Sequence, residues 1–311
     1  MQKKISVLLP VFNEQNNVDA IYLAVKNIFV QFSEYLYEII FIDDGSTDLT
    51  LPNIIKIAAA DNSVLYISFS RNFGKDNALC AGLRKSTGNA VITMDADLQH
   101  APNLITELIH KWESGYEVVY YFRKNKNKHA STLSGFFSTT FYKTLNALSD
   151  VKLENGISDF RILDKKVVDC LANLPEDTLF FRGLIKWAGF KQLGLPYNPS
   201  ERNHGKSTYK TSMLFKLAIQ SITSFSTKPL TIAIYLGFVF STLSILYIPY
   251  IIYSKINGFA ISGWASIIAT IVFFGGLNLM ILGIVGLYLG KTFMQGKGRP
   301  QYIVSQTNIE S

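Results

Sequence analysis

Two aspartates one residue apart, Asp95 and Asp97, follow directly on the short apolar run 90–94. A short apolar run bounded by polar residues is typical of a buried β-strand, so both carboxylates are expected at the end of a strand. Carboxylate oxygens are hard ligands that hold Mg²⁺ or Mn²⁺ against the phosphates of a ligand. Asp-x-Asp alone is weak evidence, because most such pairs lie in solvated turns. The position after a strand, with Gln99 close by, makes the pair a candidate metal site.

A second acidic pair, Asp43 and Asp44, is followed by Gly45 and Ser46 after another apolar run. Asp, Gly and Ser all suit a turn or a helix cap. At a strand end, two carboxylates in series could instead accept hydrogen bonds from the ribose hydroxyls or the base edge of a nucleotide. The sequence argues against a P-loop nucleoside triphosphatase, because it contains no Gly-x-x-x-x-Gly-Lys-Ser/Thr loop.

Along the first half of the chain, apolar runs typical of strands alternate with segments that have the apolar spacing of helices. Apolar runs typical of strands occur at 5–9, 37–42, 64–69 and 90–94, and segments with helical spacing occur at 16–32, 51–60 and 77–86. Repeated strand and helix units predict a three-layer α/β fold with a mostly parallel sheet. In such sheets ligands bind outside the carboxyl ends of the strands, so the polar loops are expected at one edge. Those loops are 10–14, 43–46, 70–75 and 95–99.

After residue 115 the strand and helix patterns no longer alternate regularly. A strand is expected over 117–122 and a second apolar segment over 156–163, followed by a helical pair that ends near residue 189. The apolar face of a helix over 133–148 fits either the protein core or the bilayer surface.

Two uncharged apolar runs, 229–253 and 264–290, are each long enough to cross a hydrocarbon core of about 30 Å as a helix. The helical spacing over 209–225, just before them, includes two lysines and favours a helix at the membrane interface. Only Lys255 is basic between the two runs, whereas both flanks are basic, which predicts that both termini are cytoplasmic. The first ten residues lack the apolar stretch of a secretory signal peptide, so the preceding domain is expected in the cytoplasm.

The net charge of +7 in 311 residues comes from basic residues in clusters rather than along one stripe. These are Arg123, Lys124, Lys126, Lys128, Arg202, Lys206, Lys210, Lys216, Lys228, Lys291, Lys297 and Arg299. Such placement favours anionic headgroups or phosphates over nucleic acid as partners. Cys80 and Cys170 are far apart and have no metal-ligand spacing, so neither a disulfide framework nor a zinc site is predicted.

Six segments in order resemble the GT-A glycosyltransferases of family 2, and within them the polyprenyl-phosphate glycosyltransferases. They are Leu-Pro-Val-Phe-Asn-Glu at 9–14, Asp-Asp-Gly-Ser at 43–46, Arg-Asn-Phe-Gly-Lys at 71–75, Asp-Ala-Asp-Leu-Gln at 95–99, Ser-Asp-Phe-Arg at 158–161 and Arg-Asn-His-Gly at 202–205. The likeness is greatest to the bactoprenol (undecaprenyl-phosphate) glucosyltransferases, and dolichyl-phosphate mannosyltransferases are related.

The resemblance implies an α/β GT-A (Rossmann-like, mostly parallel sheet) catalytic domain and a C-terminal two-helix transmembrane anchor. The expected parts are a cytoplasmic catalytic domain at 1–208, an amphipathic interfacial helix at 209–228, transmembrane helices at 229–253 and 264–290, and a cytoplasmic basic tail at 291–311. A multi-pass protein of the inner or plasma membrane of a bacterium follows.

The resemblance also assigns roles to individual residues. Residues implied to bind the nucleotide sugar are Pro10, Phe12, Glu14, Asp43, Asp44, Lys75, Asp95, Ala96, Asp97 and Gln99. The Mg²⁺ or Mn²⁺ ion is expected on Asp95, Asp97 and Gln99, and the acceptor and diphosphate on Arg123, Arg161, Arg202 and Lys206. Asp97, Asp159 and Arg161 are implied as catalytic, with Asp159 favoured as an orienting group over a base.

One departure from the family pattern leaves a phosphate contact open. Family members usually have Lys after Arg-x-x-Gly-x-Ser/Thr, whereas Thr208 follows Ser207 here. Lys206, Lys210 or neither could meet the phosphate.

The implied reaction is the inverting transfer of one hexose, expected to be glucose from UDP-glucose, to undecaprenyl phosphate at the cytoplasmic face of the membrane. The product would serve the modification of a surface glycan. A GDP-mannose-dependent polyprenyl-phosphate mannosyltransferase and a non-catalytic nucleotide-sugar-binding module remain alternatives. A processive polysaccharide synthase is disfavoured, because residues 184–187 lack Gln-x-x-Arg-Trp and two spans make a poor channel. The sugar and any homo-oligomer stay open.

Overall fold

The computed structural model describes residues 2–97, 103–123, 157–174, 181–197, 226–257 and 263–309. These residues fall into two units. The sheet unit holds the described residues up to 197 together with 299–309, and the helical unit holds 226–257 and 263–298. The segments 133–148 and 209–225, for which helices were predicted, lie outside the described residues.

Among the described residues of the sheet unit, eight strands form one sheet in the order β7-β5-β6-β4-β1-β2-β3-β8. The strands are β1 (Lys4–Val11), β2 (Leu36–Asp43), β3 (Val64–Phe69), β4 (Ala90–Thr93), β5 (Val118–Arg123), β6 (Ile157–Asp164), β7 (Gln192–Tyr197) and β8 (Val304–Thr307). β1 runs parallel to β2 and β4, β2 to β3, and β5 to β7. β6 and β8 run antiparallel to their neighbours. The prediction of an α/β fold with a mostly parallel sheet is confirmed.

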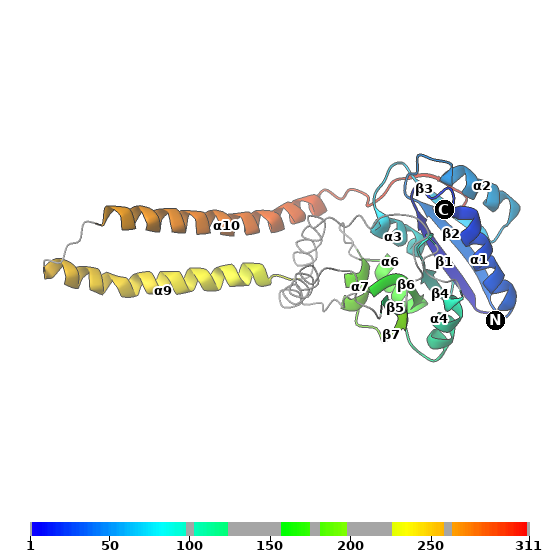
Figure 1. Ribbon diagram of the computed structural model, residues 1–311, viewed down its shortest axis with the longest axis horizontal. Helices are drawn as coiled ribbons and strands as arrows, with labels where there is room; N and C mark the ends of the chain where they lie inside the picture. The colour runs from blue at the N-terminus through cyan, green and yellow to red at the C-terminus, as the bar shows by residue number, and fades with distance from the viewer. Residues whose placement is uncertain are drawn as a thin grey trace. The chain divides into compact units, whose positions relative to one another are not determined.

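Helices cover both faces of the sheet (Figure 1). They are α1 (Val18–Gln31), α2 (Thr50–Ala60), α3 (Lys75–Lys85), α4 (Leu104–Glu113), α6 (Lys165–Ala172) and α7 (Phe181–Trp187). Ile5, Val7 and Leu9 of β1 share a core with α1, α2 and α4. Leu8 points to the opposite face, where its Cδ1 lies 2.9 Å from the position that a Cβ at Gly82 of α3 would take. Burial on both faces explains why the strands are continuous apolar runs.

Three elements of the sheet unit were not predicted from the sequence: α4, β7 and β8. Helix α4 is short, although its buried residues Ile105, Leu108, Ile109 and Trp112 have helical spacing. Strand β7 contains a glycine and a proline, which normally argue against a strand. Strand β8 is short and exposed along its length, so it carries no hydrophobic pattern.

The helical unit contains two long helices, α9 (Lys228–Ile256) and α10 (Trp264–Gly296). Both are long and apolar enough to cross a membrane by length and composition, with mean hydropathies of 1.9 over Lys228–Tyr247 and 2.3 over Ser266–Gly296. The ring of Phe240 in α9 packs edge-on against Phe274 in α10. The sequence predicted spans at 229–253 and 264–290, and the helices extend a few residues beyond them.

Candidate active site

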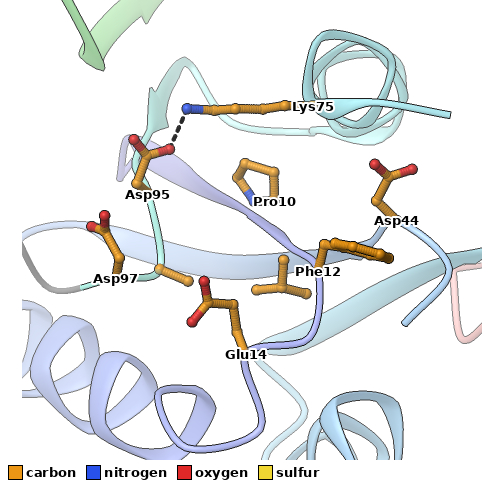
Figure 2. A pocket seen from close by; sticks show the side chains of 9 residues that line it. Pro10, Phe12, Glu14, Asp44, Lys75, Asp95 and Asp97 are labelled. Carbon is orange, nitrogen blue, oxygen red and sulfur yellow. Dashed lines mark ion pairs between the residues drawn. The ribbon is translucent and has the colours of Figure 1, made fainter. Parts of the chain in front are cut away.

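A pocket of about 260 Å³ lies where four segments of the sheet unit meet (Figure 2). Its lining residues are Pro10, Val11, Phe12, Glu14, Asp44, Lys75, Asp95, Ala96 and Asp97. They come from the end of β1, the end of β2, the start of α3 and the loop after β4. In the register of the sheet, Leu8 pairs with Thr93 and Pro10 pairs with Ile42. Parallel pairing therefore brings the carboxyl ends of three neighbouring strands together, as the sequence predicted.

The loop after β1 is fixed by hydrogen bonds to the loop after β2. Asn13 has a left-handed backbone with φ 55°, which asparagine tolerates better than most residues. Its amide N–H donates to Ser46 Oγ at 2.9 Å, and its Oδ1 accepts from the Thr47 N–H at 2.9 Å. The Glu14 N–H donates to Thr50 Oγ1 at 2.8 Å. The loop presents the ring of Phe12, 44% exposed, as an apolar surface in the pocket.

Asp43 and Asp44 have different environments. Asp43 is buried and accepts hydrogen bonds from the Ser46 N–H at 3.1 Å and Ser68 Oγ at 2.8 Å, so it holds the turn together. Asp44 lines the pocket and accepts from the Phe73 N–H at 2.7 Å and the Gly74 N–H at 2.9 Å. Burial raises the pKa of Asp44 above its usual value, although these two amides oppose the shift.

Gly45 follows Asp44 and has a left-handed backbone with φ 73°. A Cβ at this position would lie 2.4 Å from the carbonyl carbon of Arg71. Only glycine therefore allows the turn after β2 to pack this closely against the segment after β3.

The acidic pair after β4 faces the start of α3. Lys75 forms an ion pair with Asp95 and a second with Asp159, whose Oδ2 lies 2.7 Å from Lys75 Nζ. Burial alone would lower the pKa of Lys75, but the charges of Asp159 and Asp95 outweigh it and raise the pKa. Asp97 lines the same pocket. The pocket thus places a cation between carboxylates.

The donor atoms of Asp95 and Asp97 fit a hard divalent cation, because two carboxylates line one pocket. Gln99, the third predicted ligand, lies outside the described residues. Within the described residues, no group of three or more His, Cys, Asp and Glu side chains is placed to hold a metal ion. A metal here would need further oxygens, and Mg²⁺ usually takes these from water and ligand phosphates.

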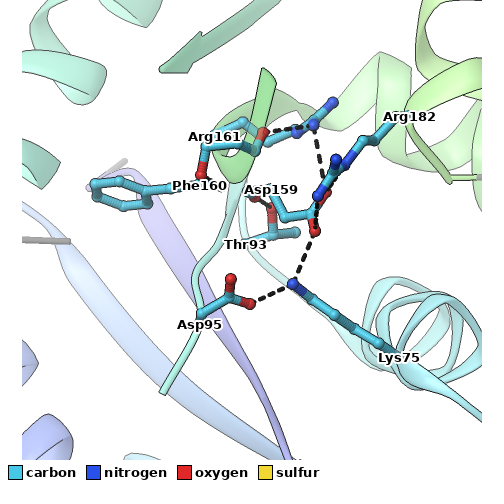
Figure 3. Close-up of polar contacts among 8 residues, drawn as sticks. Lys75, Thr93, Asp95, Asp159, Phe160, Arg161 and Arg182 are labelled. Carbon is cyan, nitrogen blue, oxygen red and sulfur yellow. Dashed lines mark hydrogen bonds and ion pairs between the residues drawn. The ribbon is translucent and has the colours of Figure 1, made fainter. Parts of the chain in front are cut away.

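A second polar cluster surrounds Asp159 of β6 (Figure 3). Arg182 of α7 binds this carboxylate with two hydrogen bonds, from Nε to Oδ1 at 2.6 Å and from Nη2 to Oδ2 at 2.8 Å. Arg161 Nη2 lies 3.5 Å from Oδ1, and Lys75 bonds Oδ2. Burial opposes the charge of Asp159, but Arg182, Lys75 and Arg161 together hold its pKa far below the usual range. A carboxylate held ionised in this way is a weak proton acceptor and a strong orienting group.

Arg161 is 2% exposed and is not among the residues that line the pocket. Its Nη2 donates to the Ser158 carbonyl at 2.7 Å, and its Nε is buried without a hydrogen-bond partner. Burial lowers the pKa of Arg161 to about 10. The structure therefore places Arg161 beside Asp159 and not in the pocket itself.

The remaining predicted phosphate ligands are only partly placed. Arg123 is the last residue of β5, and Arg202 and Lys206 lie outside the described residues.

The sequence analysis did not identify Arg182 or Asp76 as site residues. Arg182 is a lone arginine in a short helix, and its partner Asp159 is 23 residues away on another element, so no local spacing signals the pair. Asp76 lies in the first turn of α3. Burial and the negative charge of Asp159 raise the pKa of Asp76 to about 6. In the sequence, Arg182 is marked only by its position after an apolar run, which does not indicate a partner.

Comparison with known proteins identifies a family and full-length relatives. Residues 6–172 match the family model described as "Glycosyl transferase family 2". The chain is 41% identical to the putative glycosyltransferase CsbB of Bacillus subtilis, over 99% of this chain and 93% of that one. It is 37% identical to the bactoprenol glucosyl transferase of Shigella phage SfII, over 98% of each chain. Among solved structures, glucosyl-3-phosphoglycerate synthase of Mycobacterium tuberculosis is similar at 19% identity and a TM-score of 0.47, covering 71% of this chain and 79% of that one.

Proposed function

Because this chain belongs to glycosyltransferase family 2 and is a glycosyltransferase of the GT-A type, we propose that it transfers one hexose from a nucleotide sugar to a polyprenyl phosphate. The observation that carries the proposal is the pocket at the ends of β1, β2 and β4, which joins an exposed aromatic ring to four acidic side chains and a lysine. Relatives named as bactoprenol glucosyl transferases support undecaprenyl phosphate as the acceptor and glucose as the sugar.

The donor, UDP-glucose in this proposal, would bind with its base and ribose near the loops after β1 and β2. Phe12 offers an exposed ring face for the base, and burial of such a ring against a planar base is favourable. Asp44 has acceptor lone pairs beyond its two amide bonds, which suits ribose hydroxyls. Asp43 would act indirectly by holding the turn.

Asp95 and Asp97 would hold Mg²⁺ or Mn²⁺ beside the diphosphate of the donor. Such an ion offsets negative charge on a departing nucleoside diphosphate. Lys75 adds a protein cation at the same place, between Asp95 and Asp159. Its ammonium group would bind phosphate oxygens as a point charge.

The acceptor phosphate is already anionic at neutral pH, so its oxygen can attack the sugar without a strong base. One bond forms between that oxygen and C1 of the hexose while the bond from C1 to the diphosphate breaks, with inversion at C1. Positioning then dominates the rate. In this scheme Asp159 orients Lys75 and Arg182, while Arg123, Arg202 and Lys206 are proposed for binding the acceptor or diphosphate.

The helices α9 and α10 are proposed as membrane spans, with residues 1–208 as the catalytic domain and 209–228 as an interfacial helix. A lipid acceptor requires the catalytic domain to work at a membrane surface. The basic flanks of the two spans support a cytoplasmic location for both termini in a bacterial inner or plasma membrane. The segment after α10 would then return to the cytoplasm.

A transfer assay tests the function. Purified full chain in detergent is supplied with undecaprenyl phosphate, Mg²⁺ or Mn²⁺, and one radiolabelled donor at a time: UDP-glucose, UDP-galactose, UDP-N-acetylglucosamine or GDP-mannose. We expect label in the organic phase with UDP-glucose and none when the lipid is omitted. If only GDP-mannose gives label in the organic phase, the donor is GDP-mannose and not UDP-glucose. If no donor gives transfer while nucleotide binding is retained, a non-catalytic binding module is favoured.

A further inference from the structure

The C-terminal residues of the sheet unit pair with the edge strand β3. Strand β8 runs antiparallel to β3, with Ile67 opposite Thr307 and Phe69 opposite Val304. Beyond the paired residues, the Ser70 N–H donates to the Ile303 carbonyl at 3.0 Å. β8 (Val304–Thr307) is the next element after α10 (Trp264–Gly296) in the sequence, and it belongs to the sheet that carries the pocket.

The same segment places a tyrosine ring on the end of β3. The ring of Tyr302 stacks on that of Phe69, with 4.9 Å between centroids and 17° between planes. Phe69 in turn meets Phe73 edge-on at 5.8 Å. The guanidinium of Arg71 lies 3.9 Å from the centre of the Phe73 ring. A continuous row of rings therefore runs from the C-terminal segment into residues 70–75.

Residues 70–75 are the segment that holds the turn after β2. The amides of Phe73 and Gly74 donate to Asp44, and the backbone of Arg71 packs against Gly45. Lys75 at the end of this segment lines the pocket together with Asp44. A shift of the Phe73 ring would therefore move the two amides that fix the Asp44 carboxylate.

We propose that Tyr302 is a positioning residue for the nucleotide pocket, acting through Phe69 and Phe73 on the amides that bind Asp44. The proposal rests on the proposed function only in naming the bound group as a nucleoside diphosphate. The register of β3 and β8 shifts between Ser68 and Phe69, and Phe69 is the middle ring of the row. Irregularities of this kind often redirect a side chain next to an active site.

A plain structural role for the C-terminal segment makes a different prediction. A very short strand at the edge of a sheet limits pairing with other chains, and any part of β8 would contribute to that protection. Asn308 anchors the other end of the segment, where its Oδ1 accepts from the Tyr66 N–H at 2.7 Å and its Nδ2 donates to the Val64 carbonyl at 3.2 Å. Asn308 is thus a matched control, distant from residues 70–75 along β3.

The test compares Tyr302→Ala, Tyr302→Phe and Asn308→Ala in the full-length protein in detergent. Two quantities are measured: the Kd for UDP by titration calorimetry, and hydrogen exchange of peptides that contain the Phe73 and Gly74 amides. We expect Tyr302→Ala to weaken UDP binding and to speed exchange of these amides by about threefold to tenfold, as for loss of one stacked aromatic pair. Tyr302→Phe keeps the ring and should match the wild type.

Asn308→Ala should lower the Tm without changing the Kd or exchange at Phe73 and Gly74. The proposal is overturned if Tyr302→Ala leaves both quantities at wild-type values, or if Asn308→Ala changes them as much. Hydrogen exchange tests the role of Tyr302 even if the wild-type protein binds no UDP. In that event the missing affinity counts against the proposed donor, and the exchange of the two amides still supports or contradicts the role of Tyr302.

Discussion

The pocket at the ends of β1, β2 and β4 and the cluster around Asp159 on β6 lie on neighbouring strands, yet their carboxylates have opposite environments. In the pocket, Asp44 is fixed by backbone amides and Asp95 keeps a third of its side chain exposed. Asp159 is almost completely buried and is surrounded by the side chains of Arg182, Lys75 and Arg161. An accessible carboxylate can bind a ligand, whereas a buried one that is fully paired mainly orients its partners. The two regions should therefore respond differently to mutation.

The largest effect on activity is expected from Asp95→Asn in the pocket. Loss of one carboxylate of the proposed metal pair should lower kcat by about a hundredfold to a thousandfold, because charge on the departing diphosphate is no longer offset. The Tm should change little, since the side chain is partly exposed and its ion pair with Lys75 is accessible to solvent. The transfer assay and a thermal melt measure the two quantities.

Asp169→Asn is the matched control for that variant, because Asp169 is an exposed aspartate whose ion pair with Lys165 lies on the surface of α6. It should retain full activity. Full, metal-dependent activity of Asp95→Asn would show that the metal assignment is wrong.

The opposite pattern is expected for Asp159→Asn, with stability as the main loss. Removing one partner of a buried ion pair leaves the others uncompensated, which costs about 3–5 kcal/mol. Arg161 would then be buried beside a neutral amide. Chemical denaturation of the detergent-solubilised protein measures the free energy of unfolding. An unchanged free energy of unfolding together with lost activity would mean that Asp159 belongs with the pocket and acts as a base.

Arg182→Ala tests whether the cluster around Asp159 contributes to activity in the pocket or only to stability. Charged hydrogen bonds are worth about 1.5–3 kcal/mol each, so loss of the two bonds to Asp159 should lower the free energy of unfolding. If Asp159 also orients Lys75 in the pocket, kcat should fall by about tenfold to a hundredfold as Lys75 loses its position. Added guanidinium ions should restore part of the activity by filling the same place. Lys165→Ala, with guanidinium present and absent, is the control because Lys165 is partly exposed and its ion pair with Asp169 lies on the surface of α6. Activity that falls equally in both variants would contradict a specific role.

The same contrast explains how much could be predicted from the sequence. The pocket was predictable, because each of its residues follows an apolar strand and parallel strands end at one edge. Asp44, Asp95 and Phe12 were all placed in this way. The partners of Asp159 were not predictable, because Lys75 and Arg182 reach it from distant elements and burial decides its charge state.

Elements without a hydrophobic pattern were also missed. Strand β7 contains Gly194 and Pro196, and only its pairing with β5 makes it a strand. Strand β8 is exposed along its length and depends on the free edge of β3. In both cases the neighbouring strand supplies the hydrogen bonds that local sequence preference does not predict.

A smaller effect on stability is expected from Gly45→Ala, which affects the pocket through its backbone. The new methyl group would meet the Arg71 carbonyl in a left-handed turn, at a cost of about 1–3 kcal/mol. The Kd for UDP should rise as well, because the turn carries Asp44. Gly115→Ala is the control: it has a similar φ of 93° but open space around the position of the Cβ. If Gly115→Ala weakened UDP binding equally, backbone strain alone would explain the result.

The smallest effect is expected at Asp76 in the first turn of α3, whose carboxyl group is affected by burial and by the negative charge of Asp159. Its pKa of about 6 exceeds the value of about 3.9 in an unfolded chain, so the folded protein binds more protons between these two values. The contribution of Asp76 to stability therefore falls as the pH rises from about 4 to about 6, and it is constant above that. Asp76→Asn removes this loss. The free energy of unfolding of the variant, relative to that of the wild type, should therefore be about 1 kcal/mol higher at pH 7.5 than at pH 4.5. Denaturation of both proteins at the two pH values measures the difference. An equal difference at both values would mean that neither burial nor the charge of Asp159 raises the pKa of Asp76 in the folded protein.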